Sequence, residues 1–253
     1  MRRLLATAFS AVIGAALLAS PAHADQKRAD PLSHFGFQGL FGSYDKATLQ
    51  KGFVVYQTDC ASCHGLRLVH YRDLRGLGLN AQDVAGLAAG AKVPKGMGGN
   101  GKPKLIAATP DDRILSLLTP AQAAKRFNGA VPRDLSLAEA AHPGGARYIY
   151  ALLTGYRAAP DNMLMLPHHY FNTAASGMQT AMAPPLKPGS VTLANGKKLG
   201  TREMAHDVAE FLAWTADPSH DDRKSTGYGA MFFLLFLGIL VYAARFTTRR
   251  ERP

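Results

Sequence analysis

One short motif restricts the possible folds of this chain more than any other part of its sequence. It is the run Cys60-Ala61-Ser62-Cys63-His64. A C-x-x-C-H run is typical of covalent c-type haem attachment. On a helical turn the two cysteines share a face, so their sulfurs can form thioethers along one edge of a porphyrin. The histidine then lies beneath the iron and supplies the proximal ligand. The chain is therefore expected to fold around one haem c.

Two other kinds of site also contain a C-x-x-C pair. A zinc site needs further Cys or His ligands at matching spacing, and Cys60 and Cys63 are the only cysteines in the sequence. A dithiol of the thioredoxin type does not require the histidine and lies between a strand and a helix. The complete motif favours haem over both.

The N-terminus has the pattern of an export signal. Met1-Arg2-Arg3 is basic, residues 4–18 are apolar, and Ala22-His23-Ala24 has the small-x-small form of a signal-peptidase site. The apolar stretch is too short to span a bilayer comfortably, which disfavours a retained N-terminal anchor. We therefore expect residues 1–24 to be a cleaved signal peptide and the mature chain to begin at Asp25 in the bacterial periplasm.

A second apolar run, residues 226–244, contains no charged side chain over 19 residues. Its length fits one transmembrane helix, and Tyr228 and Tyr242 lie near its two ends, where aromatic rings favour the headgroup region. Four arginines follow the run: Arg245, Arg249, Arg250 and Arg252. The positive-inside rule therefore predicts a single-pass protein of the inner (cytoplasmic) membrane with a cytoplasmic C-terminus.

The expected organisation follows from these signals. Residues 25–224 form a periplasmic monohaem cytochrome c domain, residues 225–245 the transmembrane helix, and residues 246–253 a cytoplasmic tail. The formal charge is +11, but residues 25–224 carry 23 Lys and Arg against 17 Asp and Glu, a mildly basic balance of +6. A periplasmic domain of this charge gives no indication of nucleic-acid binding.

Apolar periodicity predicts a mainly α fold, a class I-like c-type cytochrome domain with long irregular loops. We expect helices over about 45–58, from Thr119-Pro120 to Asn128-Gly129, over about 144–154, and from Thr201 as N-cap to Pro218. Met204, Val208, Leu212 and Thr215 are expected along the buried face of the last of these helices.

Three segments lack this periodicity. Residues 90–104 are rich in glycine and lysine and predict a solvated loop. Residues 160–200 predict a long loop region with a small hairpin near Asn195-Gly196. Residues 217–224 are expected to be a polar linker to the membrane span.

The haem iron needs a sixth partner, and the residues leave several candidates. A methionine ligand suits electron transfer because it raises the potential, whereas an open site suits ligand binding or catalysis. Met182 lies among small residues and before two stiffening prolines, while Met178, His168 and His169 remain alternatives. The other candidates are Met97, Met163, Met165, Met204, His70, His142, His206 and His220.

Several blocks then occur in a recognisable order: FGSYDKATLQKGFVVYQTDCASCHGL, NGAVPRDLS, YIYALLTGY, AMAPPL and DVAEFLAWTADPSHDDRKSTG. Together they resemble the cytochrome c1 family, the membrane-anchored haem subunits of ubiquinol–cytochrome c reductase, the bc1 complex. The resemblance extends from about Phe41 to the C-terminus, apart from residues 76–110.

The resemblance implies particular haem contacts. Met182, in the AMAPP block, matches the family's sixth iron ligand opposite His64. Pro132 matches a residue that lines the haem edge, and Tyr148 matches the family's tyrosine. Arg133 replaces a proline of the family pattern, and His142 lies near the place of an arginine that binds a haem propionate.

The resemblance also implies a function in the respiratory chain. An electron-transfer subunit of this kind would take electrons from a Rieske iron–sulfur protein and pass them to a c-type cytochrome, while a cytochrome b subunit packs against the anchor helix. A free-standing membrane-anchored monohaem cytochrome, feeding an oxidase or dehydrogenase, is the alternative. A haem enzyme or gas sensor with an open iron site would require Met182 to be only structural.

Overall fold

The computed structural model describes residues 30–97, 99 and 103–250, so the expected signal peptide over residues 1–24 lies outside the described residues. The chain from Leu32 onward forms one compact unit. Its α-helices are α2 (Lys46–Val55), α3 (Ala81–Gly90), α4 (Pro120–Arg126), α5 (Ala146–Thr154), α6 (Thr201–Ala216) and α7 (His220–Arg250). Tighter or wider helical turns cover Pro31–Ser33, Tyr56–Cys60, Tyr71–Leu77 and Ser176–Met178.

The strands of the described chain are short and pair two by two in antiparallel fashion. Strand β1 (Leu66–His70) pairs with β4 (Arg113–Ile114), and β2 (Lys92–Met97) pairs with β3 (Pro103–Ala107). Strand β5 (Tyr170–Phe171) pairs with β6 (Gln179–Thr180). The predicted fold class, mainly α with long irregular loops, is confirmed.

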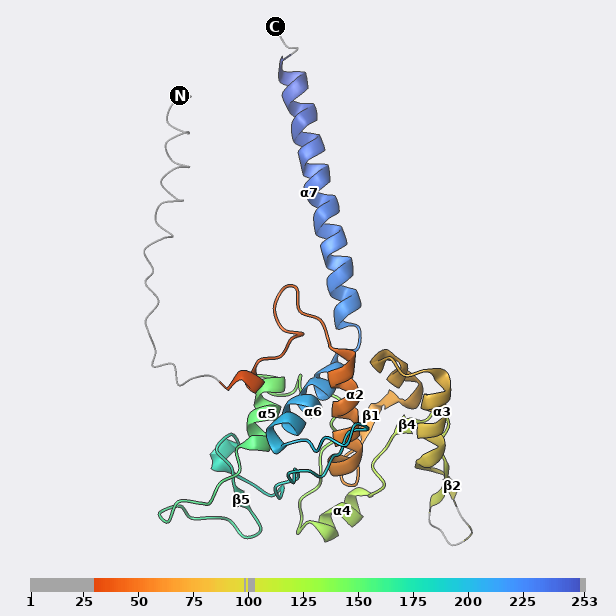
Figure 1. Cartoon of the computed structure of the whole chain (residues 1–253), viewed down its shortest axis with the longest axis vertical. Coiled ribbons are helices and arrows are strands. Elements are labelled where there is room, and N and C mark those ends of the chain that lie inside the picture. Colours follow the sequence, from red (N-terminus) through yellow and green to blue (C-terminus); the bar gives the residue numbers. More distant parts are fainter. Residues whose placement is uncertain (1–29, 98, 100–102, 251–253) are drawn as a thin grey trace. The chain divides into compact units, whose positions relative to one another are not determined.

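Helix α6 lies at the centre of the core and packs against both α2 and α5 (Figure 1). The four residues predicted for its buried face, Met204, Val208, Leu212 and Thr215, are all buried. Helices α2 and α6 cross closely at Gly52, where an added Cβ would lie 2.1 Å from the Asp207 carbonyl oxygen. This crossing fixes the direction in which α2 enters the C-x-x-C-H motif.

Helix ends agree well with the sequence signals. The Asp45 carboxylate accepts hydrogen bonds from the backbone N–H groups of Ala47 and Thr48 and so caps α2. The Thr119 hydroxyl accepts from the Gln122 N–H at the start of α4, with Pro120 in the first helical position. At α6 the cap lies one residue earlier than predicted, because Gly200 takes that position and Thr201 begins the helix.

The Gly- and Lys-rich segment 90–104 is not the solvated loop that its composition predicts. Gly90 ends α3, and β2 then pairs with β3 as a hairpin. Val93 is buried, which ties the hairpin to the core, and Lys95 forms an ion pair with Asp112 at 3.2 Å. The prediction was wrong because one buried valine and a cross-strand partner outweigh the local composition.

The expected polar linker over residues 217–224 is also different in the structure. Helix α7 begins at His220, two residues after Pro218. Asp221 and Asp222 in its first turn favour a helix start, since carboxylates interact well with the positive end of the helix dipole. The charged segment is thus the first part of the same helix that carries the apolar run.

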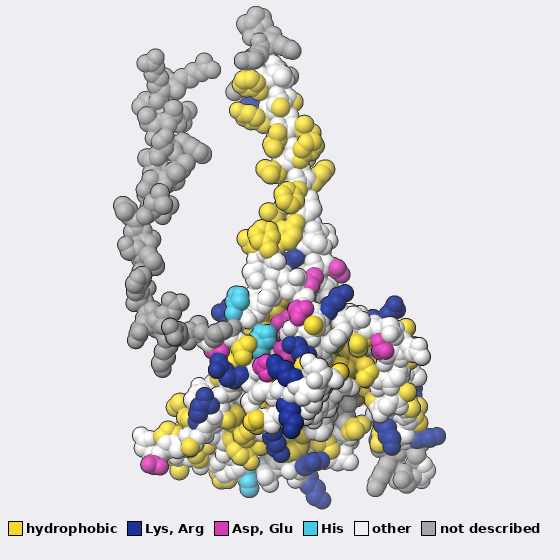
Figure 2. Space-filling view, in the orientation of Figure 1, with side chains coloured by type: hydrophobic (Ala, Val, Ile, Leu, Met, Phe, Trp, Pro, Cys, Tyr) yellow, Lys and Arg dark blue, Asp and Glu magenta, His cyan; other side chains and the backbone are white. Residues whose placement is uncertain are grey.

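Helix α7 is long and apolar enough to cross a membrane. The candidate span covers His220–Thr247, 28 residues, with a mean hydropathy of 2.0 over its most apolar window. No part of that window is buried within the described chain. Hydrophobic side chains follow one another along α7, whereas charged side chains gather where the helix meets the domain (Figure 2).

Candidate haem-binding site

The C-x-x-C-H motif forms one continuous turn at the end of α2. The helix widens to a π-helical turn over Tyr56–Cys60, and the Ala61 N–H donates to the Tyr56 carbonyl at 2.8 Å. The N–H groups of Cys63 and His64 then both donate to the Cys60 carbonyl, at 3.0 and 2.9 Å. This turn gives the three residues the helical spacing that attachment along one porphyrin edge requires.

A buried tyrosine holds the end of the turn. The Tyr56 hydroxyl donates a 2.9 Å hydrogen bond to the His64 carbonyl. Tyr56 is 1% exposed, and burial raises the pKa of its phenol, so the hydroxyl stays neutral and remains a donor.

The imidazole of His64 is oriented for metal ligation. Its Nδ1 lies 2.6 Å from the backbone carbonyl oxygen of Arg133. A carbonyl only accepts, so Nδ1 carries the proton and Nε2 keeps a free lone pair. A ligating histidine typically has this outer hydrogen bond, which fixes the ring and makes it a stronger ligand.

The Cys60 thiol does not resemble the reactive thiol of a redox dithiol. Cys60 is buried, and burial raises the pKa of its thiol to about 12, whereas reactive dithiols have lowered values. Within the described residues, no group of three His, Cys, Asp or Glu side chains is arranged to hold a metal ion. A haem brings four nitrogen ligands of its own, so His64 and one further side chain would complete the coordination of its iron.

An open cavity of about 180 Å³ lies beside the turn. Several of its lining side chains are apolar, and Val131 is 49% exposed in the structure, as expected of a surface that a flat apolar group covers. Pro132, predicted at the haem edge, is part of this lining together with Cys63. The full lining consists of Cys63, Gly65, Ser116, Leu118, Pro120, Ala123, Val131, Pro132 and Asp134.

The segment that carries the Arg133 carbonyl is tied to the chain just after the motif. The Asp134 carboxylate accepts from the backbone N–H groups of Arg67 (2.8 Å) and Ser136 (3.0 Å). The Leu135 N–H donates to the Gly65 carbonyl at 2.9 Å. Sequence reasoning missed Asp134 as a positioning residue. Its place in the NGAVPRDLS block, directly after Arg133, was the available signal.

Met182 lies in the loop after β6 and is half-buried. Its backbone N–H donates to the Thr180 hydroxyl at 3.2 Å, and its carbonyl accepts from the Tyr156 hydroxyl at 3.0 Å. The second of these bonds ties the loop backbone to the segment that follows α5. None of the hydrogen bonds described in the structure joins Met182 to the Cys60–His64 turn, so its role as iron ligand stays a prediction.

Tyr148 lies on α5, where its ring stacks on His142 with centroids 4.4 Å apart and an interplanar angle of 23°. This contact brings together the tyrosine that matches the family's tyrosine and the histidine near the expected place of the family's propionate-binding arginine. No hydrogen bond of the described chain connects Tyr148 with the motif turn either, so its haem contact also stays a prediction.

The other axial-ligand candidates differ in their surroundings. Met204 is fully buried, and its sulfur accepts from the Ser190 hydroxyl at 3.3 Å, which agrees with a core role. Met178 is 51% exposed, and His169 Nδ1 lies 2.9 Å from the Pro167 carbonyl oxygen. The side chain of Met97 lies outside the described residues.

Comparison with known proteins gives the family. Residues 35–251 match the model of the Cytochrome C1 family. The chain belongs to this family. It is 36% identical to the cytochrome c1 of Rhodospirillum rubrum, with 94% of this chain and 92% of that protein covered. The resemblance seen in the sequence blocks is confirmed.

Mitochondrial relatives of the cytochrome c1 family are nearly as similar. The cytochrome c1-2, heme protein, of Solanum tuberosum is 35% identical, with 89% of this chain and 87% of that protein covered. The cytochrome b-c1 complex catalytic subunit of Candida albicans is 34% identical, with 85% and 76% covered. The family match over residues 35–251 includes both the Cys60–His64 turn and α7.

Proposed function

We propose that this chain is the haem subunit of a cytochrome bc1 complex. It takes electrons from a Rieske iron–sulfur protein and passes them to a c-type cytochrome in the respiratory chain. Membership in the cytochrome c1 family supports this function, as does the Candida albicans relative named as the catalytic subunit of such a complex. The observation that carries the proposal is the His64 imidazole, which the Arg133 carbonyl holds through Nδ1, so that Nε2 is the nitrogen available to an iron.

Each residue of the site has a proposed part. Cys60 and Cys63 would bind one haem c covalently, and His64 and Met182 would ligate its iron. When bound, the haem would supply an iron that takes up and releases one electron at a time. Pro132 would line the haem edge, and Tyr148 would be a further haem contact.

The surroundings of the ligands set how readily the electron moves. The Arg133 carbonyl keeps the His64 ring in one orientation. A neutral thioether such as that of Met182 favours ferrous iron and so raises the potential. Apolar cavity residues, among them Leu118 and Val131, exclude water from the haem edge, which raises the potential further.

The membrane arrangement is also part of the proposal. Residues 1–24 are a cleaved signal peptide, residues 25–224 form the periplasmic haem domain, and residues 225–245 cross the inner membrane. Residues 246–253 are cytoplasmic. The apolar, unburied side chains of α7 support the span, and the cytochrome b subunit packs against it.

One purification tests this function against its alternative. Membranes solubilised in mild detergent are separated on a native gel, stained for haem, and the subunits of each haem band are identified. We expect the chain to migrate with a cytochrome b and a Rieske protein, and its haem to be reduced when a quinol is added. A haem band that contains this chain alone would indicate a free-standing membrane-anchored cytochrome instead.

A further inference from the structure

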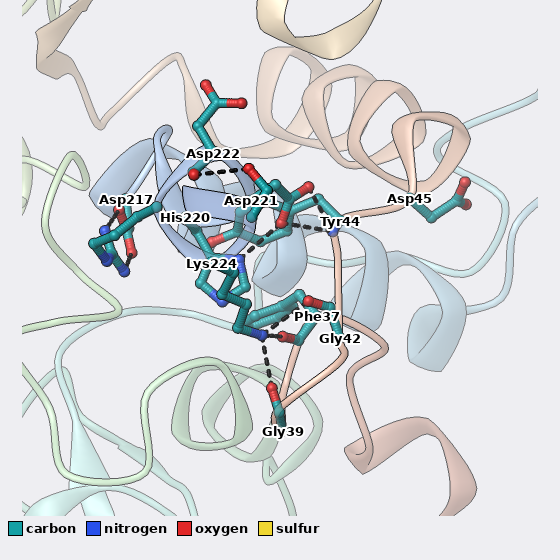
Figure 3. A network of polar contacts seen from close by, with 12 residues as sticks. Phe37, Gly39, Gly42, Tyr44, Asp45, Asp217, His220, Asp221, Asp222 and Lys224 are labelled. Carbon is teal, nitrogen blue, oxygen red and sulfur yellow. Dashed lines mark hydrogen bonds and ion pairs between the residues drawn. The ribbon is translucent and has the colours of Figure 1, made fainter. Parts of the chain in front are cut away.

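The loop that precedes α2, residues 36–44, is bound to the start of α7 through one lysine. The Lys224 ammonium donates to the backbone carbonyls of Phe37 (2.9 Å), Gly39 (2.7 Å) and Gly42 (2.8 Å) (Figure 3). An ammonium has three N–H donors. The 36–44 loop therefore uses the whole donor capacity of Lys224.

A second contact holds the end of the same loop. The Tyr44 N–H donates to the Asp221 carboxylate at 3.1 Å. Asp221 and Lys224 are three residues apart, and residues at this spacing lie on one face of a helix. One face of the first turns of α7 thus holds both ends of the loop.

Two glycines let the loop close tightly. Gly39 has a φ of +85°, in the left-handed region that glycine adopts without strain. An added Cβ at Gly42 would lie 2.4 Å from the Gln38 carbonyl oxygen. The chain therefore folds back on itself here and leaves Leu40 and Phe41 at the tip.

The tip of the loop is strongly apolar and points outward. Leu40 is 76% exposed and Phe41 is 87% exposed, whereas Phe35 and Phe37 of the same segment are buried. The charged groups beneath the tip, the Lys224 ammonium and the Asp221 carboxylate, instead bind the backbone of the loop. A surface with two large adjacent apolar side chains and no outward charge fits an apolar partner.

The position of Phe41 relative to α7 indicates which apolar partner the tip of the loop contacts. Its ring stacks on that of Tyr228, with centroids 5.6 Å apart and an interplanar angle of 28°. Tyr228 follows Lys224 by one turn, about 6 Å along the axis at 1.5 Å per residue, and no charge follows until Arg245. Tyr228 thus marks the aqueous end of the apolar run, the depth at which aromatic rings favour the membrane interface.

We propose that the 36–44 loop is a second membrane contact of this chain. Leu40 and Phe41 insert into the headgroup region of the lipid bilayer beside α7, and Lys224 holds the loop on the helix. The proposal rests on α7 as the membrane span. Two contacts restrict how the haem domain turns about the membrane normal, which one helix alone would not do.

Spin labels on the haem-loaded full chain test this contact. The complex containing the chain is placed in nanodiscs of phosphatidylcholine and phosphatidylglycerol, with one nitroxide at Phe41→Cys, Leu164→Cys or Leu235→Cys. Leu164 is 89% exposed on the domain and serves as the water-exposed control. Leu235, 63% exposed on α7, serves as the control within lipid. Collisions with oxygen report lipid, and collisions with a water-soluble nickel chelate report water.

We expect the oxygen-to-nickel collision ratio at residue 41 to be several-fold above that at residue 164 and below that at residue 235. A ratio at 41 equal to that at 164 would overturn the proposal. A label at 41 shielded from both reagents would overturn it in favour of a protein neighbour. Residue 235 in lipid with residue 41 in water would refute the loop contact alone, whereas both in water would also refute the proposed span.

The lysine is tested in the same Phe41→Cys background. Lys224→Met keeps much of the side-chain volume but removes all three donors, so the loop should leave the helix. The collision ratio at residue 41 should fall several-fold and the spectrum should show faster motion. Lys197→Met, which removes an ion pair with Glu203 elsewhere on the domain, should change neither. An unchanged label in the Lys224→Met variant would show that this lysine does not hold the loop.

Discussion

Replacing Gly52 with alanine should separate α2 from α6 and destabilise the domain. The added Cβ would lie 2.1 Å from the Asp207 carbonyl oxygen and 2.7 Å from the Phe211 Cβ, where ordinary contacts begin at 3.4 Å. The nearest atom belongs to the main chain of α6, so no rotamer change relieves the contact. The two helices must move apart by more than an ångström.

Two opposing effects set the change in unfolding free energy that Gly52→Ala should cause. Overpacking a core costs about 1–3 kcal/mol, and a clash with main chain belongs near the upper end of that range. Alanine has a higher helix propensity than glycine, and this difference stabilises the folded state by about 1 kcal/mol. The net loss is then about 2 kcal/mol, which lowers the melting temperature of a domain of this size by about 4–8 °C.

A second helical glycine provides the matched control. Gly86 lies within α3, is exposed, and has nothing within 4 Å of an added Cβ. Gly86→Ala should therefore gain only the helix-propensity effect and raise the melting temperature by roughly 2–4 °C. The measurement is thermal unfolding of the detergent-solubilised full chain by circular dichroism at equal haem content. A Gly52→Ala variant that unfolds at or above the wild-type temperature would refute the close helix crossing.

Three further changes test the site and the core. Met182→Leu should lower the midpoint potential sharply and allow carbon monoxide to bind, whereas Met204→Leu should leave the spectrum unchanged; a normal potential in Met182→Leu would assign the sixth ligand elsewhere. Tyr156→Phe removes the hydrogen bond to the Met182 carbonyl, so it should cost about 1 kcal/mol in denaturant unfolding and make carbon monoxide binding detectable. The Asp207 carboxylate raises the pKa of His206, so the stability from this pair is complete below the usual histidine pKa of 6.5 and is lost as the pH rises through the higher folded-state value. His206→Gln should abolish this loss of stability with rising pH, measured as the melting temperature across pH. An unchanged pH dependence of the melting temperature would show that the His206–Asp207 pair is not its cause.

The sequence determined the parts of this protein that depend on local chemistry. The C-x-x-C-H spacing predicts a helical turn that places both cysteines and the histidine close together, and the structure forms a helical turn there. The caps at Asp45 and Thr119 mark helix starts because their side chains bond the adjacent backbone. The apolar run in α7 can be recognised from the sequence as a candidate membrane span, because a helix satisfies its own backbone hydrogen bonds without a tertiary partner. The order of the sequence blocks was sufficient to indicate the family.

Composition gave a wrong prediction for two segments whose contact partners lie elsewhere in the chain. The segment 90–104 looks solvated, but a paired strand and the burial of Val93 make it a hairpin. The segment 217–224 looks like a linker because it is polar. The Asp221 carboxylate and the Lys224 ammonium instead bind a loop that lies more than 170 residues earlier in the sequence.

Only the tertiary structure decided how the site and the 36–44 loop are held. His64 is oriented by the backbone carbonyl of Arg133, 69 residues away, and Lys224 binds three backbone carbonyls of the 36–44 loop. Every residue has such a carbonyl, so no side-chain pattern in the sequence distinguishes the ones that act. Which carbonyl meets which donor depends on how α2, α6 and α7 pack, because packing alone brings these distant segments within hydrogen-bonding distance.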